Sequence, residues 1–155
     1  MNWETDMRNV QSTLITMILI ALPLSGCERE ATASSNPSPA TLEESGQPGI
    51  KRVRLTARAA ERLGIETAQV REEAVTIADD SVQRKVIPYG AIIYDTKGQT
   101  WTFTNPEPLV FLRQSVIVER IAGNKVVLTE GPPAGTAVVT VGSAELMGAE
   151  SKYGH

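Results

Sequence analysis

Cysteine and histidine are almost absent from this chain, since each occurs once among 155 residues, as Cys27 and His155. One cysteine cannot form an internal disulfide. Two soft ligands at opposite ends of a chain cannot complete a structural zinc site, which needs four ligands. A Cys–His nucleophile pair is disfavoured for the same reason. We therefore expect no metal site, no cofactor, no catalytic residues and a non-enzymatic function.

Aromatic residues and excess positive charge are also scarce. Phe, Trp and Tyr make up 5% of the chain, and the formal net charge is −3. Binding to nucleic acid depends on a surplus of Lys and Arg that neutralises phosphates, so we expect no nucleic-acid partner. No apolar run is long enough for a membrane-spanning helix, which needs about 20 residues. The longest, residues 14–24, has eleven.

The run at 14–24 is typical of the apolar region of a secretory signal peptide. The sequence Leu24-Ser25-Gly26-Cys27 follows at once and matches the bacterial lipobox, in which small residues precede a lipidated cysteine. We therefore expect residues 1–26 to be a lipoprotein signal peptide and Cys27 to carry the lipid anchor. Two acyl chains suffice for stable anchoring. The alternative is a buried amphipathic helix that happens to end in Gly-Cys.

The true start of the chain stays open between Met1 and Met7. Glu4 and Asp6 outnumber Arg8 ahead of the apolar run, whereas a start at Met7 would leave the cleaner basic signal.

Residues 28–49 are rich in Ser, Pro, Ala, Thr, Glu and Gly, and their only large apolar residue is Leu42. Such a segment buries too little surface to offset its chain entropy. We therefore expect residues 27–49 to be the lipidated cysteine followed by a disordered linker, with a root-mean-square reach of roughly 25 Å.

A folded domain is expected over residues 50–148, with a flexible tail at 149–155. Alternation predicts a strand at 51–56. Thr56 can cap a helix over 57–63 that Gly64 ends. Residues 65–77 read as one long strand, and 79–81 as a turn.

The second half of the chain shows short strands at regular spacing. They are expected at 85–88, 91–94, 99–104, 109–121, 125–129 and 136–141. Turns are expected at 95–98, 105–108, 122–124 and 131–135, and one helical turn at 143–146. The fold class is therefore mainly β, a small antiparallel β-roll or open barrel with one short helix.

Few residues suggest a binding role. Trp101, Phe103 and Phe111 can form either a binding platform or part of the core, and the scarcity of aromatics favours the core. Asp79 and Asp80 read as a solvated turn. Residues 131–135 lack the lysine of a phosphate loop. Because loops carry recognition, the candidate partner-contact residues are Trp101, Glu107, Pro108, Pro132 and Pro133.

Several stretches share a family resemblance. They are Val86-Ile87-Pro88-Tyr89-Gly90-Ala91, the glycine turn and aromatic strand at 98–103, the strand at 111–116, and the loop and strand at 131–146. Together they resemble the membrane-proximal domain of periplasmic adaptor subunits (membrane fusion proteins, HlyD-like) of resistance-nodulation-division efflux pumps. Residues 53–68 are similar to the lead-in of such adaptors. Pro132 departs from the family's usual leucine. The chain also passes directly from Ala78 to Gln83, where the family inserts a lipoyl-like domain and a helical hairpin.

The resemblance implies a periplasmic lipoprotein that acts as an adaptor-like or accessory component of an efflux transporter. Its partners would be transporter or adaptor subunits and, through the lipid, a membrane. Glu28 rather than Asp after the cysteine favours the outer membrane by the sorting rule of two-membrane bacteria. Without the hairpin, the chain should not bridge to an outer channel by itself. The alternatives are a stand-alone periplasmic module that binds a ligand or envelope polymer, and a degenerate remnant.

Overall fold

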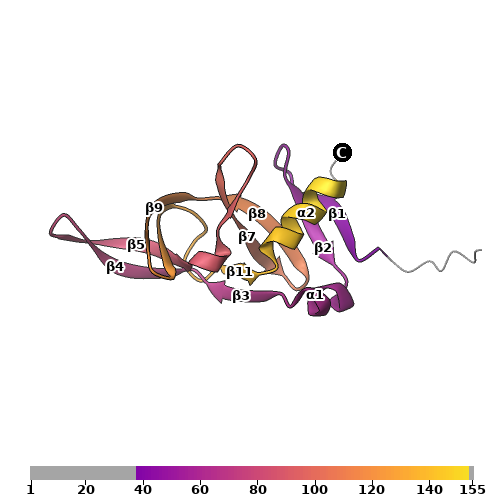
Figure 1. Ribbon diagram of the computed structural model, residues 1–155, viewed down its shortest axis with the longest axis horizontal. Coiled ribbons are helices and arrows are strands. Elements are labelled where there is room, and N and C mark those ends of the chain that lie inside the picture. Colours follow the sequence, from indigo (N-terminus) through magenta and orange to yellow (C-terminus); the bar gives the residue numbers. More distant parts are fainter. Residues whose placement is uncertain (1–37, 154–155) are drawn as a thin grey trace, which may run out of the picture. The chain divides into compact units, whose positions relative to one another are not determined.

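The computed structural model describes residues 38–153. The predicted signal peptide at 1–26, Cys27, Glu28 and His155 lie outside the described residues. The described part is mainly β, as predicted, with eleven strands in two antiparallel sheets and two α-helices (Figure 1). Neither sheet closes into a barrel.

The larger sheet, here sheet A, contains strands from both ends of the described chain. Its order is β1 (Ala40–Glu44), β2 (Lys51–Leu55), β8 (Val110–Ser115), β7 (Thr100–Glu107), β11 (Ala137–Val141) and β3 (Glu66–Gln69), and β6 (Ile93–Tyr94) also pairs with β7. The helices α1 (Ala57–Leu63) and α2 (Ser143–Tyr153) accompany this sheet, and α2 contacts β1, β2 and β7. Phe103, Phe111, Val53 and Leu146 are at most 3% exposed in the core of this part.

The smaller sheet, here sheet B, has the order β4 (Arg71–Ile77), β5 (Asp80–Pro88), β10 (Lys125–Glu130) and β9 (Ile117–Ala122). The chain passes between the sheets four times: at Val70, through the 3₁₀ turn η1 (Tyr89–Ala91), at Val116, and through residues 131–136. Val70, Ala91 and Val116 are themselves buried in one apolar cluster with residues of both sheets. The crossing points therefore form the core of the junction.

Two of the predicted strands are corrected by these crossings. Residues 65–77 and 109–121 were each expected to form one strand, but each is divided at a buried valine, and its two halves belong to different sheets. The local sequence does not reveal where each strand divides, because Val70 and Val116 continue the apolar pattern of the strands on either side.

The expected disordered linker is also corrected, since β1 lies inside it. β1 pairs with β2 in antiparallel register from Ala40 opposite Leu55 to Glu44 opposite Lys51. Only Ala40 is fully buried in this strand. Its further stabilisation comes from backbone pairing and from ion pairs with β2, among them Arg54 Nε to Glu43 Oε1 at 2.6 Å. Composition does not record such pairing.

The helix over 57–63 is confirmed with both of its ends. The Thr56 side chain accepts a hydrogen bond from the Ala59 amide at 3.2 Å, and Gly64 ends the helix at a φ of 61°. By contrast, the expected single helical turn at 143–146 continues as α2 to Tyr153, so the prediction of a flexible tail from 149 is wrong through residue 153. Leu146 and Glu150, four residues apart, face the protein interior, and the charge of Glu150 obscured that buried face.

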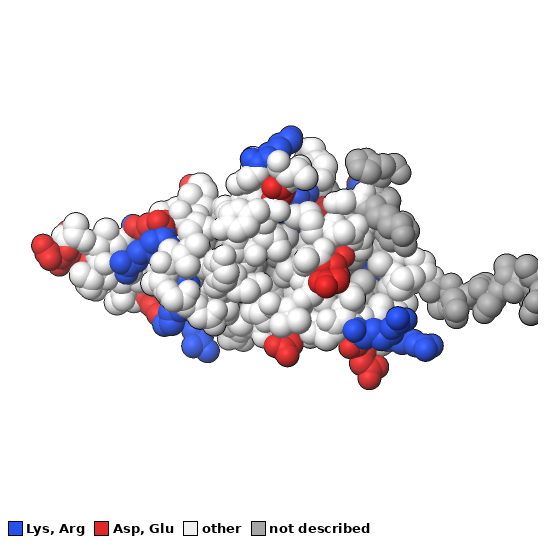
Figure 2. Space-filling view, viewed as in Figure 1, with Lys and Arg blue, Asp and Glu red and all other residues white. Residues whose placement is uncertain are grey.

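Two expected turns are displaced. β7 continues through the expected break at 105–108 to Glu107, with an irregular register after Thr104 that accommodates Pro106. The turn expected at 79–81 lies at Ala78 and Asp79. Charged side chains lie in small groups of mixed sign on the face seen in Figure 2.

The β4–β5 turn is strained at Ala78, and this yields a stability prediction. Ala78 and Asp79 have φ values of 45° and 76°, the positive values that a type I′ hairpin turn requires. Alanine in this region costs about 1–2 kcal/mol, and glycine relieves it at some cost in chain entropy. We expect Ala78→Gly to raise the free energy of unfolding by about 0.5–1 kcal/mol in urea titrations.

Ala74→Gly provides the matched control, because Ala74 is exposed in the middle of β4 and its φ is not positive. This substitution should lower the free energy of unfolding by roughly 0.5–1 kcal/mol. If both substitutions destabilise the protein equally, the turn is not strained.

Candidate functional site

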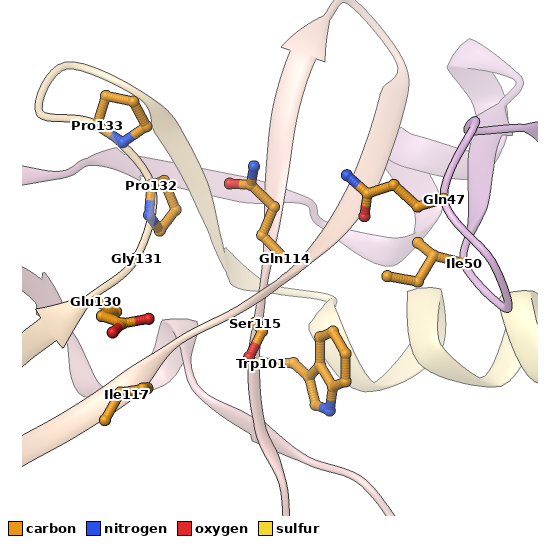
Figure 3. A pocket seen from close by; sticks show the side chains of 10 residues that line it. All are labelled: Gln47, Ile50, Trp101, Gln114, Ser115, Ile117, Glu130, Gly131, Pro132 and Pro133. Carbon is orange, nitrogen blue, oxygen red and sulfur yellow. The ribbon is translucent and has the colours of Figure 1, made fainter.

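An open hollow of about 420 Å³ lies where the chain crosses between the sheets. We call it the Trp101 hollow. It is lined by Gln47, Ile50, Trp101, Gln114, Ser115, Ile117, Glu130, Gly131, Pro132 and Pro133 (Figure 3). These residues come from the β1–β2 connection, from β7 to β10, and from the loop that leads to β11.

Three of the five predicted contact residues meet in this hollow. Trp101 lies at the start of β7, and Pro132 and Pro133 lie some thirty residues later in the chain. Pro133 is exposed, whereas Pro132 is almost completely buried. Whether any of these residues contacts a partner stays a prediction.

Glu107 and Pro108 lie apart from the hollow, at the opposite end of β7 from Trp101. Both are exposed. Glu107 faces Arg52, with an Nη1 to Oε1 distance of 3.5 Å. Exposed ion pairs of this kind contribute little to stability. Of the three aromatic residues considered as platform or core, Phe103 and Phe111 are core, and only Trp101 is partly exposed.

The loop of residues 131–135, which contributes Pro132 and Pro133 to the lining of the hollow, is held in place by hydrogen bonds and by packing. Lys85 Nζ donates to the Gly131 carbonyl at 2.7 Å, and the Gly135 amide donates to the Val70 carbonyl at 2.8 Å. A Cβ on Gly131 would lie 2.9 Å from Leu128 Cδ1 and 3.3 Å from Val116 Cγ1. Only glycine therefore fits there without displacing the junction core.

Trp101 is held by hydrogen bonding at its edge and by a cation at its face. Its indole Nε1 donates to Asp95 Oδ2 at 3.1 Å. The Arg113 guanidinium carbon lies 4.3 Å from the ring centroid, a cation–π arrangement. Arg113 Nε lies 3.1 Å from Glu150 Oε2, and these side chains are 14% and 6% exposed. The indole therefore reaches the hollow in one defined orientation.

Asp95 also organises the turn before β7. Its Oδ1 accepts the amides of Lys97 at 2.8 Å and Gln99 at 2.9 Å. Desolvation alone would raise the pKa of Asp95, but the hydrogen bonds from Gln99, Trp101 and Lys97 and the charge of Arg113 outweigh it and lower the pKa below 3.8.

The open side of the hollow carries two glutamines that composition did not single out. In Figure 3, Gln47 extends from the β1–β2 connection toward Gln114 of β8. The Gln114 Oε1 atom is buried and has no hydrogen-bond partner within the described chain. Gln47 lies in the expected linker, Ile50 is the expected first residue of the folded domain, and Gln114 and Ile117 lie in an expected strand. The pairing of β1 with β2 is the signal that would have placed Gln47 here.

Within residues 38–153, no group of three or more His, Cys, Asp or Glu side chains is placed to hold a metal ion. None of the helices described over those residues is both long and apolar enough to cross a membrane. Comparisons with protein-family models, curated proteins and solved structures gave no match.

The lowered pKa of Asp95 predicts a pH dependence of stability. The unfolded chain binds this proton more tightly than the folded one, so the stabilisation is complete above about pH 4 and is lost as the pH falls below that value. In Asp95→Asn, the free energy of unfolding should therefore fall less steeply between about pH 5 and pH 3 than in the wild type. Denaturant titrations across this range measure both slopes.

Asp79→Asn, at the tip of the β4–β5 hairpin, is the control, because Asp79 is exposed and is distant in sequence from the turn that Asp95 organises. It should keep the wild-type slope. Identical slopes for Asp95→Asn and the wild type would contradict the role given to Asp95.

Proposed function

We propose that this chain is a non-enzymatic lipoprotein of the bacterial periplasm, anchored to a membrane through Cys27. Its β domain acts as an adaptor-like or accessory component of an efflux transporter. The Trp101 hollow is the surface that docks a transporter or adaptor subunit.

One observation carries this proposal. Trp101, Pro132 and Pro133, which the sequence suggested as contact residues, come from separate segments and converge on one open hollow. A partly exposed tryptophan beside prolines is typical of a protein-docking surface, where tryptophan is enriched among the residues that dominate binding. Its orientation is fixed by Asp95 and Arg113, which lowers the entropy lost on binding.

The anchor supplies proximity rather than specificity. Ten residues lie between Cys27 and Ser38, the first described residue, so the eleven steps from one to the other span at most about 40 Å when fully extended. Tethering within that distance raises the effective concentration of the domain at a membrane protein to roughly millimolar.

The docking surface can be tested by filling the hollow. Gln47→Arg together with Ser115→Arg places two long charged side chains at exposed positions of its lining. A pull-down from detergent-solubilised membranes should recover an efflux transporter or adaptor subunit with the wild-type chain, identified by mass spectrometry. We expect recovery to fall at least about tenfold with the variant, the loss of one hot-spot contact.

Ser81→Arg together with Gln83→Arg is the matched control. It changes the same residue types at exposed positions of β5, outside the hollow. Recovery should equal that of the wild type. If no transporter or adaptor subunit is recovered with the wild-type chain, or if both variants lose it equally, the proposal fails.

A second function is favoured by the size of the hollow. A volume of about 420 Å³ lies within the range of small-ligand sites, roughly 300–1,000 Å³. A stand-alone module that binds a ligand or envelope polymer would then replace the docking role. The sequence has two tryptophans, Trp3 and Trp101, so in a chain without Trp3 the tryptophan fluorescence comes from Trp101 alone. A change in this fluorescence on adding cell-envelope extracts would identify such a ligand.

The anchor itself has a separate test. Cys27→Ser removes the thiol that takes the lipid, whereas every residue of the apolar core clusters lies between Ala40 and Ala149. We therefore expect the domain to fold with wild-type stability but to move from the membrane to the soluble periplasmic fraction. If this variant still fractionates with membranes, the proposed lipid at Cys27 is not what holds the chain there.

A further inference from the structure

A second hollow, of about 330 Å³, lies between the two helices and the first strand of sheet A. We call it the Leu63 hollow. It is lined by Pro39, Ala40, Leu55, Ala59, Arg62, Leu63, Glu145 and Ala149. Six of these eight residues are apolar, and the other two are charges of opposite sign on α1 and α2. An apolar depression with charge at its rim matches the chemistry of a phospholipid, which joins a charged headgroup to acyl chains.

The helix beside this hollow carries two arginines of the same face. Arg58 and Arg62 lie four residues apart on α1 and are exposed. Like charges at this spacing destabilise a helix slightly. Neither arginine forms an ion pair within residues 38–153, although the six ion pairs found there use six other cationic side chains. In Figure 2, Lys and Arg side chains over the position of α1 lie directly beside Asp and Glu side chains.

The place where the chain joins the domain supports a membrane as the occupant. Pro39 lines the hollow, and β1 begins at the next residue. The 37 residues that precede Ser38 therefore join the domain at this hollow. They include Cys27, so a lipid on that cysteine would hold this end of the domain within about 40 Å of the bilayer.

We propose that the α1 end of the domain binds directly to a bilayer that contains anionic phospholipid. Arg58 and Arg62 contact the phosphate headgroups, and the Leu63 hollow lies against the acyl-chain boundary. Glu145, the acidic residue of the lining, belongs to α2, and α1 carries one exposed acidic residue, Glu61, beside its two arginines. The headgroups therefore gather over the arginine face of α1. This contact is additional to the lipid on Cys27 and to docking at the Trp101 hollow.

The charge of the domain makes the proposal specific. Residues 36–155 contain thirteen Lys and Arg and fourteen Asp and Glu, so the domain as a whole is not attracted to an anionic surface. Binding to such a surface must come from a local group of cations. Each arginine near an anionic membrane strengthens binding about fivefold.

The test uses residues 36–155, which form one compact unit and contain the whole of each apolar core cluster. The chain is sedimented with vesicles of phosphatidylcholine that contain 30% phosphatidylglycerol, and with vesicles of phosphatidylcholine alone. We expect binding to the anionic vesicles and at least about tenfold weaker binding to the neutral ones.

Three variants locate the surface. Arg58→Gln with Arg62→Gln should weaken binding to anionic vesicles roughly 25-fold, and Glu145→Gln should strengthen it about fivefold. Arg71→Gln with Arg120→Gln removes the same charge from exposed positions of sheet B and should leave binding unchanged. Far-ultraviolet circular dichroism checks that each variant is folded.

Three outcomes would overturn the proposal: no binding to anionic vesicles, equal binding to neutral vesicles, or equal loss with the two arginine pairs. A failure of the proposed docking function is distinguishable from these. Gln47→Arg with Ser115→Arg should leave vesicle binding intact, whatever its effect on recovery of a transporter subunit.

Discussion

The largely buried ion pair between Arg113 and Glu150 joins the larger sheet to the C-terminal helix, beside the buried Leu146 of the same helix. Arg113 projects from β8 to Glu150 of α2 on one side and to the ring of Trp101 on the other. The second carboxylate oxygen of Glu150 accepts the Lys51 amide of β2 at 3.1 Å. One guanidinium and one carboxylate thus join three strands and a helix. Removing either partner would leave the other with weaker compensation, namely the Lys51 amide for Glu150 and the Trp101 ring and the Gly49 carbonyl for Arg113. The orientation of Trp101, and with it the Trp101 hollow, depends on the same contact.

The junction between the sheets follows from a different constraint. Where the chain leaves one sheet for the other, its backbone must bend without exposing apolar surface. Val70 and Val116 meet this requirement by being buried at the bends, in contact with Val138 of sheet A and Val126 and Leu128 of sheet B. The loop at 131–135 completes the junction, because its carbonyl and amide groups bond to Lys85 and Val70. The Trp101 hollow is a part of this junction that is open to solvent.

Features encoded by neighbouring residues could be predicted, and features that depend on distant partners could not. Thr56 and Gly64 specified both ends of α1, and alternation with turn residues specified most strands of the second half. β1 was missed because its pairing with β2, rather than its composition, makes it a strand. α2 was shortened because its buried Glu150 reads as a surface residue until Arg113 is seen beside it. In the Trp101 hollow, Trp101 and the proline loop could be proposed from the sequence. Gln47 and Gln114 could be assigned to the hollow only once the strand pairing of the sheet was known.

Sheet B is built from two hairpins, residues 71–88 and 117–130, each inserted into the succession of strands that forms sheet A. Both ends of each hairpin return to the same junction, as the paired positions Arg71 and Val86 show for the first. The turn at the far end of the first hairpin, at Ala78 and Asp79, is therefore a point where the chain can lengthen without moving any residue of the junction. A guest domain spliced into this turn would cost little more than the closure entropy of its linkers. The domain would thus serve as a host for insertions, with its own register undisturbed.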